Sequence, residues 1–245
     1  MLMIRNLVYT IIVIVWVIVA TIVLGCTTIV TAFFSKKGDG PHLVARAWAG
    51  SILWVARVKV NLKGIGNLPQ NTPCILMPNH QSNFDIPVLL GRLPVQFRWL
   101  AKAELFRIPI FGRGMRGCGY ISIDRSNRKS AFKSLGDAVL RIRDGASVLV
   151  FPEGTRSRDG EIGTFKKGGF VLTVDAGVPI VPIIIYGTRT IMPKGSVLMR
   201  PRDVHMEILP PVETSAYTRE TKDLLIKEVR TIICAAFDRV KEDSI

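Results

Sequence analysis

A histidine and an aspartate five positions apart are the residues of this sequence best suited to acid–base chemistry. His80 and Asp85 lie between the apolar run 74–77, which is typical of a buried strand, and the segment 86–90, which is typical of the first turns of a helix. On a regular helix they would be about 140° apart and could not share a face. If the chain turns between them, Asp85 can accept from one ring nitrogen of His80 and leave the other free to take a proton.

The same stretch also permits a purely structural interpretation. Asp85 stands where it could cap the helix that contains Pro87. The neighbouring polar residues are good turn formers: Asn79, Ser82 and Asn83. No Ser or Cys nucleophile is evidently paired with the histidine, so the spacing alone leaves both interpretations open.

The segment 150–158 brings together groups that suit the binding of an anion. It leaves a predicted buried strand abruptly and then carries Glu153, Gly154, Thr155 and Arg156. An arginine offers paired donors to phosphate oxygens, and a glycine lets a ligand approach the backbone closely. The spacing of a P-loop is absent, so the segment does not predict that kind of nucleotide-binding loop.

Two more cations follow predicted strands, Lys102 after the run 97–101 and Arg125 after the run 120–123. In α/β sheets, ligands bind where the ends of strands enter loops. Basic residues at such places are suited to meet an anion, although each one alone is equally consistent with a solvated surface charge.

The apolar run 178–185 contains two prolines and also has two possible roles. Its residues either line a channel for an acyl chain or belong to the core of the domain. The channel candidates are Val178, Pro179, Ile180 and Pro182.

The 245-residue chain is strongly basic, because 33 Lys and Arg residues against 19 Asp and Glu residues give a net charge of +14. Such a charge favours anionic partners such as phosphates, acidic lipids, an acidic carrier protein or nucleic acid. The charges gather in loops after predicted strands, and no platform of aromatic and basic residues is visible, so nucleic acid is not expected. The four cysteines and three histidines are too scattered to predict a disulfide framework or a metal site.

Residues 7–34 contain no charged residue and exceed the roughly 20 apolar residues that span a bilayer. A cleaved signal peptide is the alternative, but the apolar run is too long and 31–34 is a poor cleavage site. We therefore expect an uncleaved anchor. Lys36 and Lys37 follow it, against a lone Arg5 before it, which places the next domain on the cytoplasmic side of the inner membrane.

The next segment, 41–60, is too polar for a second confident span. It suits either a helix in the headgroup region, with Trp48 and Trp54 at the interface, or a core helix of the globular domain. We expect residues 1–60 to form a membrane-anchoring helical hairpin and residues 61–245 to form an α/β domain.

From residue 59 onward, short apolar runs alternate with segments of helical periodicity. This alternation predicts an α/β fold with a mixed, largely parallel sheet flanked by helices. We expect the segment 108–114 to be a loop and 204–209 to be an edge strand. Expected strands are 58–62, 74–77, 97–102, 120–123, 147–151 and 180–186, and expected helices are 129–143, 170–176 and 218–240.

Four of these segments, in this order, resemble the glycerolipid acyltransferase family, and within it the 1-acyl-sn-glycerol-3-phosphate (lysophosphatidic acid) acyltransferases. The stretch 79–85 matches the family's His-and-Asp motif, and 119–125 matches its Gly, hydrophobic and Arg motif. Residues 151–157 match Phe-Pro-Glu-Gly-Thr-Arg-Ser letter for letter, and 178–182 match a proline-containing apolar motif. Ser122 departs from the bulkier residue that members often carry there.

The resemblance implies that the nucleophile is the 2-hydroxyl of 1-acyl-glycerol-3-phosphate, deprotonated by His80 while Asp85 holds the ring. The glycerol phosphate would be held by the motif residues Arg125, Glu153, Gly154, Thr155 and Arg156, with Lys102 a further candidate. The product would be phosphatidic acid for phospholipid biosynthesis. No metal and no cofactor are implied beyond an acyl-CoA or acyl-carrier-protein thioester as co-substrate, and the N-terminal helices would lie in or on the membrane among its lipids.

Two rival functions remain at this point. The same acyl transfer could act on another acceptor, such as glycerol-3-phosphate or a lyso form of an amino-acid lipid. A membrane-tethered protein that only binds anionic lipids is the rival from another class, and it predicts no turnover of thioesters.

Overall fold

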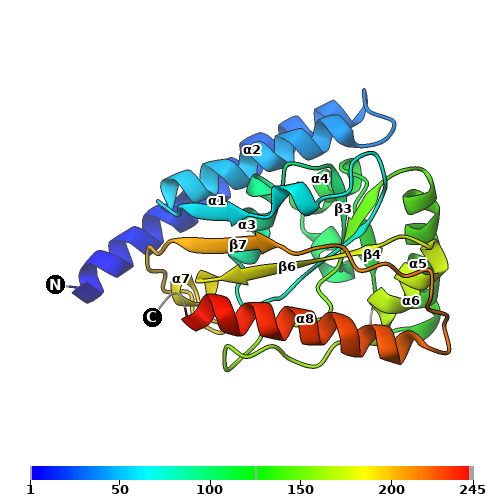
Figure 1. Cartoon of the computed structure of the whole chain (residues 1–245). Helices are drawn as coiled ribbons and strands as arrows, with labels where there is room; N and C mark the ends of the chain where they lie inside the picture. The colour runs from blue at the N-terminus through cyan, green and yellow to red at the C-terminus, as the bar shows by residue number, and fades with distance from the viewer. Residues whose placement is uncertain (1, 125, 243–245) are drawn as a thin grey trace.

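The computed structural model describes residues 2–124 and 126–242. In this part of the chain a seven-stranded sheet has helices on both faces (Figure 1). The strands are β1 Val60–Lys63, β2 Ile75–Pro78, β3 Phe97–Lys102, β4 Ile121–Ile123, β5 Ser147–Leu149, β6 Ile180–Tyr186 and β7 Val204–Ile208. The helices are α1 Leu2–Ala32, α2 Asp39–Val55, α3 Asp85–Arg92, α4 Phe111–Gly117, α5 Arg128–Arg143, α6 Lys167–Ala176, α7 Thr188–Ile191 and α8 Lys222–Glu242, with short 3-10 helices η1 Ile65–Asn67 and η2 Ala103–Arg107.

The sheet is mixed and mostly parallel, as the sequence predicts. Its strand order is β1-β7-β6-β2-β5-β3-β4, and the β6–β7 pair alone is antiparallel among the described strands. Because β2, β5, β3 and β4 are parallel, the loops that follow them emerge at one edge of the sheet.

The prediction that residues 204–209 form an edge strand is wrong. β7 pairs with β6 on one side and with β1 on the other. Val204 and Met206 are buried, whereas His205 is exposed. This alternation reports that one face of the strand is covered, and it carries no information about which strands pair along its backbone.

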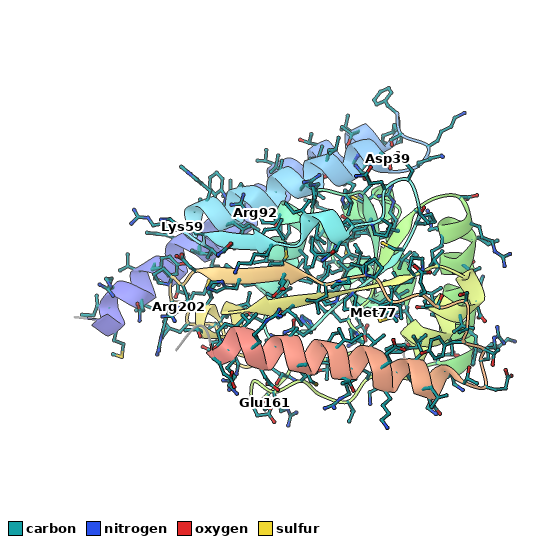
Figure 2. All side chains as sticks on the ribbon, in the orientation of Figure 1. Asp39, Lys59, Met77, Arg92, Glu161 and Arg202 are labelled. Atoms are coloured by element: carbon teal, nitrogen blue, oxygen red, sulfur yellow. The ribbon has the colours of Figure 1, made fainter. Side chains whose placement is uncertain are left out.

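The two faces of the sheet bury separate hydrophobic clusters. Leu76 of β2 packs with residues of α2 and α3, whereas its neighbours Ile75 and Met77 pack with residues of α5, α6 and α8. Figure 1 shows α1 and α2 side by side on one side of the sheet and α8 on the other. The loop that follows β2 is therefore carried by a strand at the centre of the core, where Met77 is labelled in Figure 2.

Helix α2 lies between α1 and the α/β unit. Ala49, Ile52 and Leu53 are buried, and the helix contacts both α1 and α3. Trp48 donates from Nε1 to Thr21 Oγ1 of α1 at 3.1 Å. Of the two interpretations of this segment, the structure therefore favours a core helix, and the boundary expected at residue 60 stays a prediction.

Helix α1 is largely uncovered. By length and composition, Met3–Ala32 is able to cross a membrane, and little of it is buried. A stripe of apolar side chains on its outer face is about half exposed: Ile11, Val15, Ile18 and Ile22. The inner face packs on the protein, for example through Tyr9, whose hydroxyl donates to Ala56 O at 2.6 Å.

The prediction that residues 108–114 form a loop is wrong at its second half, because α4 begins at Phe111. The glycines that lower helix propensity by about 1 kcal/mol each are needed for close packing. A Cβ on Gly112 would lie 2.2 Å from Phe106 O, and one on Gly117 would lie 2.8 Å from the Cβ of Ala32 in α1. Tertiary contact with α1 and η2 therefore overrides the local preference.

A buried polar network fastens the α1–α2 turn to the sheet. Arg98 of β3 is 3% exposed, and its Nη2 donates to Lys37 O at 2.8 Å and to Asp39 Oδ1 at 2.5 Å. The fully buried His42 of α2 shares a 3.0 Å hydrogen bond between Nδ1 and Tyr120 Oη. Burial, reinforced by the charges of Arg98 and Arg46, lowers the pKa of His42 to about 3.

Candidate active site

His80 and Asp85 are in contact, as a turn between them would require. His80 Nδ1 lies 2.7 Å from Asp85 Oδ2. The same carboxylate oxygen accepts from the backbone N–H groups of Gln81 at 2.7 Å and Ser82 at 2.8 Å. Asp85 is fully buried and is the first residue of α3, whose N-terminus has no side-chain cap. The aspartate therefore does not cap the helix but organises the loop that carries the histidine.

The imidazole ring of His80 is also fixed from its face. The ring of Phe151 stacks on it with centroids 3.8 Å apart and planes 15° apart, and Trp99 packs behind Phe151. The His80 side chain is 14% exposed. Among the described residues no hydrogen bond uses Nε2, so this nitrogen is available to a ligand.

Both backbone polar groups of His80 are held by the segment after β5. His80 N donates to Glu153 Oε1 at 2.8 Å, and Ser157 N donates to His80 O at 2.8 Å. Glu153 is 3% exposed, and its second oxygen accepts from Gly163 N at 2.9 Å. Burial raises the pKa of Glu153, while these two N–H donors and the charge of His80 counteract the shift. Both carboxylate oxygens therefore accept from backbone N–H groups around the histidine, and the expected contact of Glu153 with the substrate stays a prediction.

Two of the three polar residues that are also good turn formers, Asn79 and Ser82, anchor the loop to β6 and to the segment after it. Asn79 is buried and makes two hydrogen bonds with the backbone of Ile185. Asn79 Nδ2 donates to Ile185 O at 2.9 Å, and Ile185 N donates to Asn79 Oδ1 at 2.7 Å. Ser82 Oγ donates to Met192 O at 2.8 Å. The loop is consequently held from α3, from the segment after β5 and from β6.

The predicted anion-binding residues lie at the same edge of the sheet, after the parallel strands. Lys102 ends β3 and is exposed, with Nζ 2.8 Å from Glu104 Oε1. Gly154 has a φ of 70°, which suits glycine, and Thr155 is exposed. The side chain of Arg156 makes no hydrogen bond among the described residues. Arg125 lies outside the described residues.

Lys194 is a cation at this site that sequence reasoning missed. Its Nζ donates to Arg156 O at 2.6 Å and to Thr155 Oγ1 at 3.2 Å. It follows β6 by eight positions and belongs to none of the motifs. The contact joins residues that are 38 or 39 positions apart, which no local pattern reveals.

The structure places Val178, Ile180 and Pro182 in the core of the domain and leaves Pro179 partly exposed, and their expected role in lining an acyl channel stays a prediction. Ile180 is fully buried among residues of α6 and α8. It pairs with Ile75, whereas Ile183 is level with Pro78, two residues before His80. The run therefore starts at the end of β6 that is remote from the histidine, and it fills the core.

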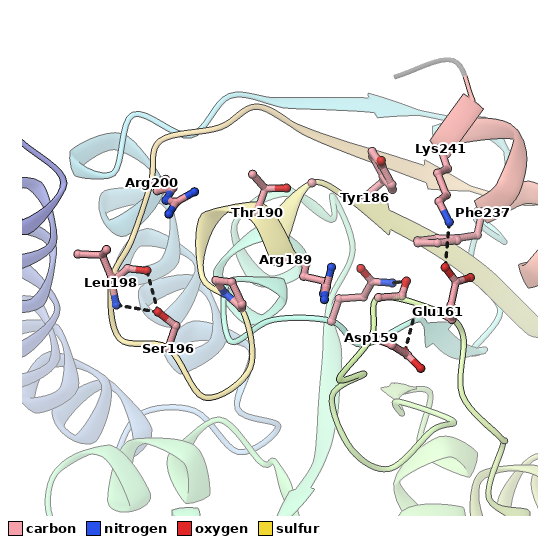
Figure 3. A pocket seen from close by; sticks show the side chains of 14 residues that line it. Asp159, Glu161, Tyr186, Arg189, Thr190, Ser196, Leu198, Arg200, Phe237 and Lys241 are labelled. Atoms are coloured by element: carbon pink, nitrogen blue, oxygen red, sulfur yellow. Dashed lines mark hydrogen bonds and ion pairs between the residues drawn. The ribbon is translucent and has the colours of Figure 1, made fainter. Parts of the chain in front are cut away.

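A cavity of about 350 Å³ lies beside the His80 loop, at the carboxyl end of β6 (Figure 3). Gln81 of the His80 loop and Gly160 both line it, and Gln81 Nε2 donates to Gly160 O at 2.7 Å. Figure 3 shows Arg189, Arg200 and Tyr186 around it, with Lys241 paired to Glu161. None of the predicted site residues that the structure describes lines this cavity.

The described residues contain no group of three or more His, Cys, Asp or Glu side chains that could hold a metal ion. The absence of a metal and of a resident cofactor stays a prediction.

The fold and the His–Asp site together define a class of protein: the chain belongs to the acyltransferase family, whose sequence model matches residues 59–186. The resemblance inferred from the motifs is thus confirmed. Curated relatives include a chloroplastic 1-acyl-sn-glycerol-3-phosphate acyltransferase of Brassica napus, 38% identical over 81% of this chain and 56% of the relative. An enzyme of that name from Borreliella burgdorferi is 29% identical over 78% of this chain and 79% of the relative.

A solved structure is similar to this chain over nearly its whole length. The 1-acyl-sn-glycerophosphate (LPA) acyltransferase PlsC of Thermotoga maritima is 28% identical, with a TM-score of 0.83 and coverage of 98% of each chain. The present chain spans about half the length of the chloroplastic relatives from Brassica napus and Arabidopsis thaliana.

Proposed function

We propose that this protein is a membrane-bound acyltransferase that moves a fatty acyl chain from a thioester to the 2-hydroxyl of 1-acyl-glycerol-3-phosphate, giving phosphatidic acid. The observation that carries the proposal is the oriented pair, with His80 Nδ1 held 2.7 Å from a buried Asp85 carboxylate. Relatives from a plant and from a bacterium are named for this activity.

In the proposed reaction, His80 Nε2 takes the proton of the acceptor hydroxyl as its oxygen attacks the thioester carbonyl carbon. Asp85 stabilises the imidazolium that forms, as its position on Nδ1 allows. The tetrahedral intermediate then collapses, the carbon–sulfur bond breaks, and the thiolate leaves with the proton from His80. No acyl-enzyme is formed, since the nucleophile belongs to the substrate.

The acceptor's phosphate would be held where the loops after β3, β4 and β5 meet. Thr155 and Arg156 are accessible there, and a guanidinium binds phosphate through paired, charge-assisted hydrogen bonds. Gly154, Lys102 and Arg125 complete the proposed phosphate site. Glu153 is left out of it, because both of its oxygens already accept backbone N–H groups.

The donor is proposed to be acyl-CoA or an acyl carrier protein, both of which carry negative charge that suits a protein of net charge +14. We place the protein at the inner membrane with its α/β unit facing the cytoplasm. This location is supported by the apolar helix α1 and by the cations at both of its ends, Arg5 before it and Lys36 and Lys37 after it.

The test is a transfer assay with labelled acyl thioester and purified protein in detergent. We expect lysophosphatidate to be the preferred acceptor over glycerol-3-phosphate and a lyso-aminolipid. His80→Ala should lose roughly two to four orders of magnitude in rate, as general-base removal does. His205→Ala is the matched control, because His205 is exposed on β7, which is separated from β2 by β6 in the sheet.

Full activity of His80→Ala would refute the mechanism. Preference for another acceptor would keep the chemistry and change the substrate. Binding of anionic lipid without thioester turnover by the wild-type protein would favour the rival of a lipid-binding protein.

A further inference from the structure

We infer that Lys194 is part of the phosphate site: it holds the Gly154–Arg156 loop and adds its own positive charge to the acceptor's phosphate. The inference rests on the proposed function and adds to it a residue outside the region that the family model matches, which ends at residue 186.

The contacts of the ammonium group carry the argument. It donates to the carbonyl oxygen of Arg156 at 2.6 Å and to the hydroxyl of Thr155 at 3.2 Å. An ammonium has three N–H donors, so one remains for a ligand after these two contacts. The Thr155 hydroxyl is also left with its own proton to donate, because it accepts from the lysine.

No carboxylate of the described residues forms an ion pair with Lys194. Its side chain is half-buried, and a charge in such a place is screened less by solvent than one at full exposure. A half-buried, uncompensated cation beside the accessible Arg156 is suited to an anion that arrives with the substrate.

The segment that carries Lys194 is fixed at both of its ends. Met192 O accepts from Ser82 Oγ of the His80 loop at 2.8 Å, and Met199 N donates to Thr10 Oγ1 of α1 at 2.9 Å. Arg200 N donates to Ile191 O at 2.9 Å and closes the segment into a loop. Lys194 therefore stands between the helix expected in the membrane and the loop expected to bind phosphate, where a lysolipid headgroup would enter.

The experiment compares acceptors with and without a phosphate, in the same micelles and with the same donor. We expect Lys194→Met to lower kcat/KM for lysophosphatidate roughly ten- to hundredfold, the size of a lost hydrogen bond to a charged group, mainly through KM. For 1-monoacylglycerol, which lacks the phosphate, the change should be less than about threefold. Lys194→Arg should recover part of the loss, because it keeps the charge.

Arg202→Gln is the matched control and should leave activity on both acceptors unaffected. Arg202, labelled in Figure 2, is an exposed cation of the same connection between α7 and β7. Equal losses on the two acceptors would mean that Lys194 only shapes the loop and would overturn the inference, as would an unchanged kcat/KM. If the wild-type protein did not acylate lysophosphatidate at all, the proposed function would fail instead.

A binding measurement makes the test independent of turnover. Lysophosphatidate is titrated calorimetrically into micellar His80→Ala protein and into His80→Ala/Lys194→Met protein. A Kd at least tenfold weaker in the double variant supports the inference, and an unchanged Kd overturns it.

Discussion

His80 is held from several directions, and each contact fixes a different degree of freedom. Asp85 sets the direction of Nδ1, while Glu153 and Ser157 pin the backbone on either side of the ring. Phe151 supplies a flat surface against which the imidazole lies. Such multiple support keeps Nε2 in one orientation, which a general base needs because proton transfer depends on geometry first.

The stacked ring of Phe151 should therefore matter for rate more than for substrate binding. We expect Phe151→Leu to lower kcat about tenfold, or roughly 1.4 kcal/mol in barrier, with little change in either KM, while Phe151→Tyr keeps the flat surface and most of the rate. Phe165→Leu is a control, because Phe165 stacks on Phe170 in the opposite core. Steady-state kinetics with both substrates would decide; an unaltered kcat in Phe151→Leu would show that the stacking is incidental.

The sequence alone is sufficient to predict a contact when the two residues are near each other in the chain. The spacing of His80 and Asp85 predicts a contact once a turn is assumed, and the structure has that contact. The roles of Glu153 and Lys194 depend on partners 73 and 38 or 39 positions away, respectively. The order of strands in the sheet brings these partners together, and no local periodicity encodes that order.

At the scale of elements, apolar alternation predicted most strands and the long helices, because burial of one face leaves a periodic trace in the sequence. It failed for β7, where alternation predicts an edge strand but the strand is paired on both sides. It also failed for α4, where Gly112 and Gly117 allow close contacts with η2 and α1. It also could not reveal the network around Arg98 and His42, which joins α2 to strand β3 and to Tyr120, the residue before β4.

The buried His42 should make the packing of α2 against the sheet sensitive to acid. In the unfolded chain the ring takes a proton below its ordinary pKa near 6.5, whereas in the folded protein it stays neutral down to about 3. The unfolded state thus binds more protons between these values, and stability falls as the pH drops, by about 2 kcal/mol from this group at pH 5. A protonated ring carries an N–H on both nitrogens, and the one at Nε2 has no acceptor among the described residues.

Replacement of this histidine should make the stability of the protein less dependent on pH in the acid range. We expect the loss of melting temperature between pH 7.5 and pH 5.0, measured in detergent, to be smaller in His42→Asn than in the wild-type protein. The absolute melting temperature of the variant at pH 7.5 should be lower, because a buried aromatic contact with Phe97 is lost. His205→Ala, which removes an exposed histidine, should keep the wild-type dependence; an equal acid response in His42→Asn would contradict the assignment.

At the scale of the whole molecule, α1 packs on the rest of the protein with one face and exposes apolar side chains on the other. Its contacts with the rest of the chain run from Tyr9, bonded to Ala56, to Ala32, which lies against Gly117. A helix attached along this length has no free stretch with which to cross a bilayer while the α/β unit stays in water. We therefore expect α1 to lie in one leaflet, with the stripe from Ile11 to Ile22 in the lipid.

The two ends of α1 should accordingly be reachable from the same side of the membrane. Single cysteines would replace Arg5 and Lys36, which are exposed at either end of the helix, in a background where Cys26 and Cys234 are serine. In sealed inside-out vesicles, a membrane-impermeant maleimide should label both positions to a similar extent, because a helix lying in the cytoplasmic leaflet would have both of its ends on the cytoplasmic face. Labelling of Lys36→Cys alone, with Arg5→Cys reacting only after the vesicles are opened, would show instead that α1 spans the bilayer and that its contacts with α2 and α4 form within the membrane.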